Sequence, residues 1–166
     1  MFALGIDPGL SRCGYGAVVA EGPVLRAVAT GHLTTPVDQD LSTRLGLLLA
    51  DLRELMVSYQ PDVVVVERVL FQANARTAMS VGQASGLALA VAAEAGIPVA
   101  QYSPNEVKQA VVGYGSATKD QVQRMVQVLL GLAEVPRPAD RADALALAIC
   151  HLSGSRLRMA AEGSSR

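Results

Sequence analysis

The sequence predicts a single α/β domain built on a mixed β-sheet. Three apolar segments of strand length come first and are separated by short turns, and the next two are each preceded by a segment with helical periodicity. Strands joined by tight turns pair antiparallel, and strands joined through a helix pair parallel. The order therefore predicts an antiparallel meander that crossover helices join to parallel strands.

The first three strands are expected at the start of the chain. Residues Phe2 to Ile6 form an apolar run with the length of a buried strand, which ends at Asp7 and is followed by the turn residues Pro8-Gly9. Small residues then lead into a second apolar run that ends at Val18-Val19. Residues 24–33 alternate loosely between apolar and polar, which is typical of a third strand.

The middle of the chain alternates between helix and strand. Apolar residues recur at helical spacing from Asp40 to Tyr59, and Pro61 ends that pattern. Four consecutive valines at 63–66 indicate a strand buried on both faces, and this strand ends at Glu67. A helix rich in small residues over 75–95 and a short strand over 97–102 follow.

Three further helices are predicted after the last strand. Ser103 and Thr118 each begin a capping-box pattern, which starts helices that end at Val112 and near Leu130. Pro138 can start the last helix. We expect residues 1–153 to form the folded domain and the polar residues 154–166 to form a flexible tail.

Composition and charge exclude several classes of protein. Just over half of the residues are hydrophobic, and the net charge is −1, so the chain is not expected to be disordered. Cys13 and Cys150 give neither a disulfide framework nor the spacing of metal ligands. We see no charged leader and no apolar segment long enough to span a bilayer, and we expect a cytoplasmic protein with no membrane partner. From Arg68 onward ten basic residues face seven acidic ones, a weak indication of a polyanionic ligand.

Four acids stand at positions where a catalytic site could form. Asp7 and Glu67 each end an apolar strand, and Asp140 and Asp143 lie three residues apart on one face of the last helix. Each has a structural alternative, because Asp often caps a turn before Pro-Gly and acids near a helix N-terminus stabilise the helix. Four converging carboxylates would repel one another unless a cation or protons joined them.

Carboxylate oxygens favour Mg²⁺ or Mn²⁺ over zinc, and no Cys/His cluster competes for a metal. Two such ions close together can activate water and stabilise a leaving oxygen in phosphoryl transfer. A convergent set of acids would therefore predict a phosphodiester substrate. The spacing in the sequence alone leaves the convergence open.

Five blocks of the sequence resemble the RuvC family of bacterial Holliday-junction resolvases. They occur in order between Phe2 and His151 and read GIDPGLSRCGYG, VVVVER, NARTAMSVGQASG, PNEVKQAVVGYGSATKDQV and ADRADALALAICH. The resemblance implies an RNase H-like fold with a five-stranded mixed sheet flanked by helices. It places Asp7, Glu67, Asp140 and Asp143 on the family's four catalytic, Mg²⁺-binding acids.

The resemblance also implies an activity and partners. The protein would be a homodimer with two active sites, each holding two Mg²⁺ ions, with Mn²⁺ as a substitute. It would resolve four-way DNA junctions by symmetric paired nicks in recombination and repair. It would act with the branch-migration proteins RuvA and RuvB.

Several residues would contact the DNA under this resemblance. Lys108 and Lys119, the two lysines of the chain, match family lysines that serve DNA binding and catalysis; the alternative is that both are solvated helix residues. Where the family often has an aromatic that stacks on junction bases, this sequence has Leu70 and then Phe71, so either residue could be the wedge. The surface would also include three polar or basic residues: Arg68, Asn74 and Arg76. His151 is expected to interact with the helix dipole, and support of the acids is its alternative role.

Three other functions share parts of this pattern. An actin-like or sugar-kinase ATPase also opens with a strand, an Asp and a glycine turn, but it needs a second subdomain that 166 residues do not supply. A non-catalytic binding module on the same fold would not need all four acids. An RNase H-like nuclease that cuts RNA or hybrid duplex would use the same chemistry, and only the five blocks favour a DNA junction.

Overall fold

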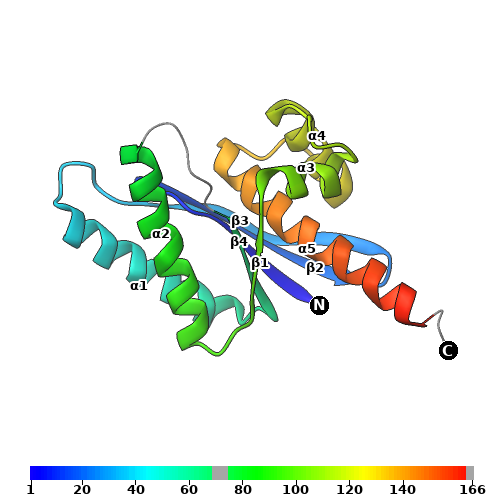
Figure 1. Cartoon of the computed structure of the whole chain (residues 1–166), viewed down its shortest axis with the longest axis horizontal. Coiled ribbons are helices and arrows are strands. Elements are labelled where there is room, and N and C mark those ends of the chain that lie inside the picture. Colours follow the sequence, from blue (N-terminus) through cyan, green and yellow to red (C-terminus); the bar gives the residue numbers. More distant parts are fainter. Residues whose placement is uncertain (69–74, 164–166) are drawn as a thin grey trace.

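The computed structural model describes residues 1–68 and 75–163, with side chains described for 1–68 and 78–155. Figure 1 shows a central sheet with helices packed on both faces. The sheet has five strands in the order β3-β2-β1-β4-β5. This architecture confirms the predicted α/β class.

The strand pairing follows the predicted meander and crossovers. β1 (Phe2–Asp7), β2 (Arg12–Glu21) and β3 (Val24–Thr34) pair antiparallel in succession. β4 (Val63–Glu67) and β5 (Val99–Tyr102) extend the sheet on the other side of β1 as parallel strands. β1 is therefore the central strand, and its carboxyl end lies beside the carboxyl end of β4.

The helices form two layers. α1 (Leu41–Tyr59) and α2 (Ala75–Glu94) cover one face of the sheet, and α3 (Pro104–Val112), α4 (Lys119–Leu130) and α5 (Ala139–Gly163) cover the other. Both predicted capping boxes are present at the starts of α3 and α4. The helix α4 thus begins at a position that its own cap determines.

The valine run in β4 divides its side chains between the two layers. Val64 and Val66 pack with Leu4 and Ile6 of β1 against α1 and α2. Val63 and Val65 pack into the second core, which includes Leu145 of α5. All four valines are buried, as expected for a strand covered on both faces.

Glycines in the two central strands allow α5 to lie very close to the sheet. A Cβ at Gly5 would stand 1.9 Å from the carbonyl oxygen of Ala144, and one at Gly14 would stand 2.2 Å from the carbonyl oxygen of Asp140. Gly5 and Gly14 belong to adjacent strands, and Gly14 pairs with Asp7. The absence of side chains at these positions therefore brings the first turns of α5 against the end of β1.

The last helix is longer than the sequence indicated. α5 continues to Gly163, through most of the segment for which we expected a tail. The flexibility of 154–166 and the domain boundary at 153 stay predictions. In the part of the chain that the structure describes, no helix combines the length and apolar character needed to cross a membrane.

Candidate active site

The ends of two parallel strands bring the first pair of acids to one edge of the sheet. Ile6 of β1 pairs with Val66 of β4, so the next residues, Asp7 and Glu67, leave the sheet side by side. The opposite neighbour of Asp7 is Gly14 of β2. Asp7 therefore has an acid on one side and, on the other, a glycine that leaves room for α5.

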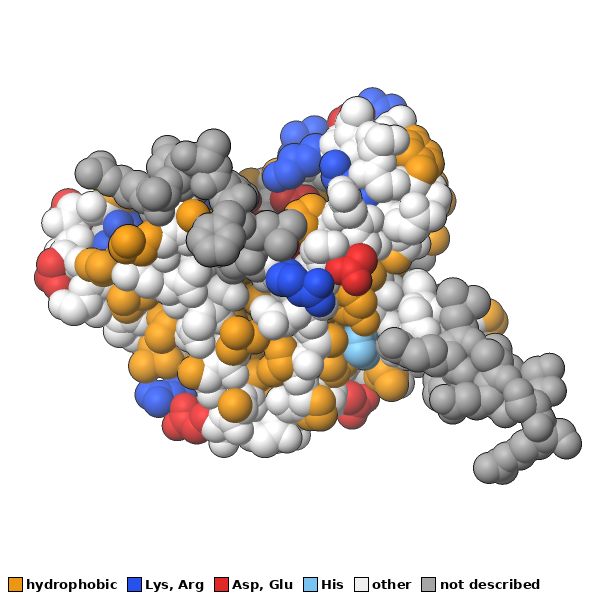
Figure 2. All heavy atoms as spheres, viewed as in Figure 1, with side chains coloured by type: hydrophobic (Ala, Val, Ile, Leu, Met, Phe, Trp, Pro, Cys, Tyr) orange, Lys and Arg blue, Asp and Glu red, His pale blue; other side chains and the backbone are white. Residues whose placement is uncertain are grey.

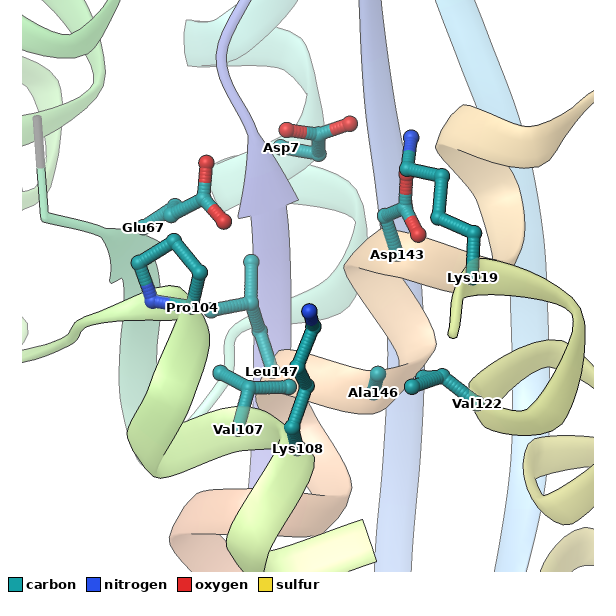
Figure 3. A pocket seen from close by; sticks show the side chains of 10 residues that line it. All are labelled: Asp7, Glu67, Pro104, Val107, Lys108, Lys119, Val122, Asp143, Ala146 and Leu147. Carbon is teal, nitrogen blue, oxygen red and sulfur yellow. The ribbon is translucent and has the colours of Figure 1, made fainter. Parts of the chain in front are cut away.

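The start of α5 supplies the second pair. Asp140 and Asp143 lie three residues apart on its first turns, over the end of β1. One carboxylate oxygen each from Asp7, Asp140 and Asp143 can be chosen so that all three lie within 4.8 Å of one another. The convergence that the spacing in the sequence left open is therefore present for these three acids. Glu67 is outside that group but lines the same cleft (Figure 3).

Asp7, Glu67 and Asp143 stand at one end of a cleft of about 350 Å³. Lys108 of α3 and Lys119 of α4 extend their amino groups into it, as Figure 3 shows. Its floor is apolar and consists of Pro104, Val107, Val122, Ala146 and Leu147. Figure 2 shows basic side chains at the mouth of a recess that holds acidic ones, over α3 and α4. The cleft is thus suited to a negatively charged ligand despite its acids.

Two basic side chains each pair with one of the acids. The Lys119 Nζ donates a hydrogen bond to Asp143 Oδ2 at 2.8 Å. The Arg12 Nη1 donates to Asp140 Oδ2 at 3.4 Å. Both basic side chains are more than half exposed, whereas both carboxylates are largely covered. The pairs therefore fix the carboxylates while leaving each cation accessible to a ligand.

The electrostatics of the cluster favour a bound cation. Burial, together with the charges of Asp143, Glu67 and Asp140, raises the pKa of Asp7 to about 8, against the opposing effect of Lys119. Burial and Asp143 also raise the pKa of Glu67. The pKa of Lys119 is raised mainly by its hydrogen bond to Asp143. A divalent cation would relieve the repulsion that these shifts express.

The donor set fits a hard metal ion. Every ligand atom that the cluster offers is a carboxylate oxygen, the type that Mg²⁺ and Mn²⁺ prefer. Cys13, the cysteine nearest in sequence to Asp7, is buried, and its thiol pKa is raised to about 12, so it does not compete as a thiolate. The residues present therefore match the predicted metal.

The other predicted DNA residues are placed differently. The Arg68 side chain donates to the Gln101 carbonyl at 3.1 Å and lies 3.8 Å from Glu106, so it ties β4 to the start of α3. Its role as a DNA contact stays a prediction. Leu70, Phe71 and Asn74 lie outside the described residues, as does the side chain of Arg76.

His151 lies one turn of α5 beyond the cleft lining. Its Nδ1 is 3.0 Å from the hydroxyl of Tyr102, at the end of β5, and its ring packs edge-on against that tyrosine. It does not line the cleft with the acids. A supporting role for His151 therefore stays a prediction that would act through Tyr102.

Sequence reasoning missed Arg12. It begins β2, five positions after Asp7, and reaches Asp140 across the sheet edge. Its nearness to Asp7 in the chain was the available signal. The direction of its side chain depends on where α5 lies, and the spacing of residues does not encode that.

Comparison with known proteins gives a consistent answer. The family model described as "Crossover junction endodeoxyribonuclease RuvC" matches residues 3–151. A curated protein of that name from Syntrophomonas wolfei is 48% identical over 99% of this chain and 96% of its own length. The structure of Thermus thermophilus RuvC is similar with a TM-score of 0.87 and 39% identity, covering 95% of this chain and 96% of that one. The same Thermus protein in complex with a Holliday junction substrate gives a TM-score of 0.86 at 37% identity, with the same coverage.

Proposed function

This chain belongs to the RuvC family of crossover junction endodeoxyribonucleases, and we propose that its acidic cleft cuts the backbone of four-way DNA junctions. The observation that carries the proposal is the group of Asp7, Asp140 and Asp143, whose carboxylates converge beside Lys119. All of these residues lie within the matched range 3–151. The likeness to a RuvC structure that holds a Holliday junction supports the choice of substrate.

The acids supply a site for Mg²⁺, with Mn²⁺ as a substitute. Asp7, Asp140 and Asp143 would hold one ion, and Glu67, at the side of the cleft, would complete a site for a second. When bound, such ions activate water and stabilise the charge on the phosphate and the leaving oxygen. The carboxylates of Asp140 and Asp143 are held in position relative to Asp7, because α5 packs closely on the sheet at Gly5 and Gly14.

The basic residues bind and orient the DNA strand. Lys108 and Lys119 extend into the cleft, where an ammonium group can contact a phosphate as a point charge. Because Lys119 already holds Asp143, a phosphate bound by the same amino group would lie next to the acids. The apolar floor limits the water around that phosphate, which strengthens each of these charge interactions.

Paired cutting requires two such sites in one assembly. The proposal therefore includes a homodimer that nicks two opposed strands symmetrically, together with RuvA and RuvB as branch-migration partners in the cytoplasm. Sedimentation of the protein with and without junction DNA tests the dimer. A monomer that cuts each strand independently would contradict the paired mechanism.

The experiment that tests the function is cleavage of end-labelled DNA in the presence of Mg²⁺. The substrates are a four-way junction, a linear duplex of the same sequence and an RNA–DNA hybrid. We expect symmetric nicks in opposed strands of the junction and none in the linear duplex. Cleavage of the hybrid in preference to the junction would contradict the substrate while leaving the metal site in place.

A further inference from the structure

A hydrogen-bond network outside the cleft holds the turn that connects Asp7 to Arg12. Thr35, a buried residue directly after β3, donates from its hydroxyl to the carbonyl oxygen of Leu10 at 2.6 Å. The same hydroxyl accepts a hydrogen bond from Arg44 Nε at 3.0 Å. Arg44, in the first turn of α1, also donates from Nη2 to Ser11 Oγ at 2.7 Å. Helix α1 is thus linked to Ser11 directly and to Leu10 through Thr35.

This turn connects a residue of the cleft, Asp7, to a residue that holds one of the acids, Arg12. Asp7 ends β1 just before it, and Arg12 starts β2 just after it and contacts Asp140. The turn is compact, since a Cβ at Gly9 would stand 2.2 Å from the carbonyl oxygen of Arg12. A compact turn passes a displacement at Leu10 or Ser11 on to its neighbours.

The partners of Arg44 indicate a positioning role. Among the described side chains, Arg12, Arg26, Arg53, Arg68 and Arg124 all pair with carboxylates. The described partners of the Arg44 side chain are two hydroxyl groups, one on Ser11 in the turn and one on Thr35, which holds the turn. A charged donor makes stronger hydrogen bonds than a neutral one. The arrangement therefore restrains the turn more than two neutral contacts would.

We propose that Arg44 and Thr35 are positioning residues that fix the 8–11 turn and so align Asp7 in the cleft and Arg12 against Asp140. The inference rests on the proposed nuclease function for its catalytic consequence, but the restraint on the turn can be measured without it. Neither residue lines the acidic cleft.

Two matched pairs of variants test the proposal. Arg44→Gln removes the charged donor, and Arg53→Gln is its control, because Arg53 lies on the same helix but pairs with Glu94 on the surface. Thr35→Val removes the hydroxyl in a side chain of the same shape, and Thr35→Ser keeps it. The second pair tests the hydroxyl itself even if Arg44→Gln folds poorly.

The first measurement is single-turnover cleavage of a four-way junction at saturating protein, beside junction affinity in EDTA. We expect Arg44→Gln and Thr35→Val to cut about tenfold more slowly at saturation, because small misplacements of reacting groups are costly. Their affinities should stay within about twofold of wild type. Arg53→Gln and Thr35→Ser should match wild type in both measurements.

The second measurement is hydrogen exchange of the 8–12 peptide without DNA or metal. Faster exchange confined to this peptide in Arg44→Gln and Thr35→Val, and not in their controls, is the expected result. If wild type cuts no junction, the proposed function fails, while the exchange still decides whether the network restrains the turn.

Three outcomes would overturn the proposal. Unchanged cleavage and exchange in Arg44→Gln and Thr35→Val would show that the turn is held without them. Weaker binding with an unchanged saturated rate would make Arg44 a DNA contact. Equal losses in Arg53→Gln would show that any weakening of α1 has the same effect.

Discussion

Asp7→Asn should make the metal-free protein more stable at alkaline pH, although it removes a catalytic acid. In the native protein the pKa of Asp7 is raised from 3.8 to about 8 by burial and by the neighbouring acids. Between these two values the native state keeps a proton that the unfolded state releases, so stability falls as the pH rises through this window. An asparagine of the same shape carries no charge and has no such loss.

The size of the effect follows from the shift. At about 1.4 kcal/mol for each tenfold change in an acid constant, a rise from 3.8 to about 8 corresponds to roughly 6 kcal/mol when the carboxyl is fully ionised. Water and side chains relax around a buried charge, so we expect about half of this, on the order of 3 kcal/mol. Near pH 5 only the lower part of this window has been crossed, so the difference between variant and wild type should be smaller, roughly 1–2 kcal/mol.

Urea unfolding in EDTA at about pH 5 and about pH 8.5 measures this difference. Asp38→Asn is the control, because Asp38 is an exposed loop residue and its substitution should change the free energy of unfolding by less than about 0.5 kcal/mol. Added Mg²⁺ should narrow the gap, since a ligand that binds only the native wild type stabilises it. A gap that is equal at both pH values, or a wild type that gains stability as the pH rises, would refute the reasoning.

Two further predictions concern the helix that carries the acids and the basic residues opposite. Gly5→Ala should destabilise the protein by about 1–3 kcal/mol in thermal or urea unfolding and should slow cleavage, because its Cβ would displace α5 at Ala144. The control Gly46→Ala, in open space on α1, should stabilise the protein by about 0.5–1 kcal/mol. Similar outcomes for both variants would contradict the close packing of α5. Junction affinity in EDTA should fall steeply as the salt concentration rises from about 50 to 200 mM. The double variant Lys108→Ala, Lys119→Ala should show a weaker dependence of affinity on salt. If the salt dependence is unchanged in the double variant, these lysines do not contact phosphate.

The sequence placed the elements well because their signals are local. The valines at 63–66 favour a strand because their side chains are β-branched. Ser103 and Thr118 start helices because their side chains accept hydrogen bonds from the first turn of the helix. Asp7 and Glu67 each end an apolar strand, and the parallel pairing of β1 with β4 places these two strand ends side by side.

What the sequence did not reveal depends on distances between layers. The contact of Arg12 with Asp140 exists because α5 lies on glycines of two different strands, and no local pattern encodes that distance. The length of α5 was underestimated for another reason. The glycine and serines at 153–155 resemble a tail, but residues 156–162 read RLRMAAE, which are good helix formers.

The most direct test of the central claim is to measure junction binding and junction cleavage together for wild type and Asp7→Asn. The account predicts that wild type cuts the junction with Mg²⁺ and not with EDTA. Asp7→Asn should bind the junction at least as tightly, because one negative charge near the phosphate is gone, and should not cut it with Mg²⁺. Metal-independent cutting by wild type, cutting by Asp7→Asn, or equal loss of binding and cleavage would contradict the assignment of the acidic cleft as the metal-dependent active site.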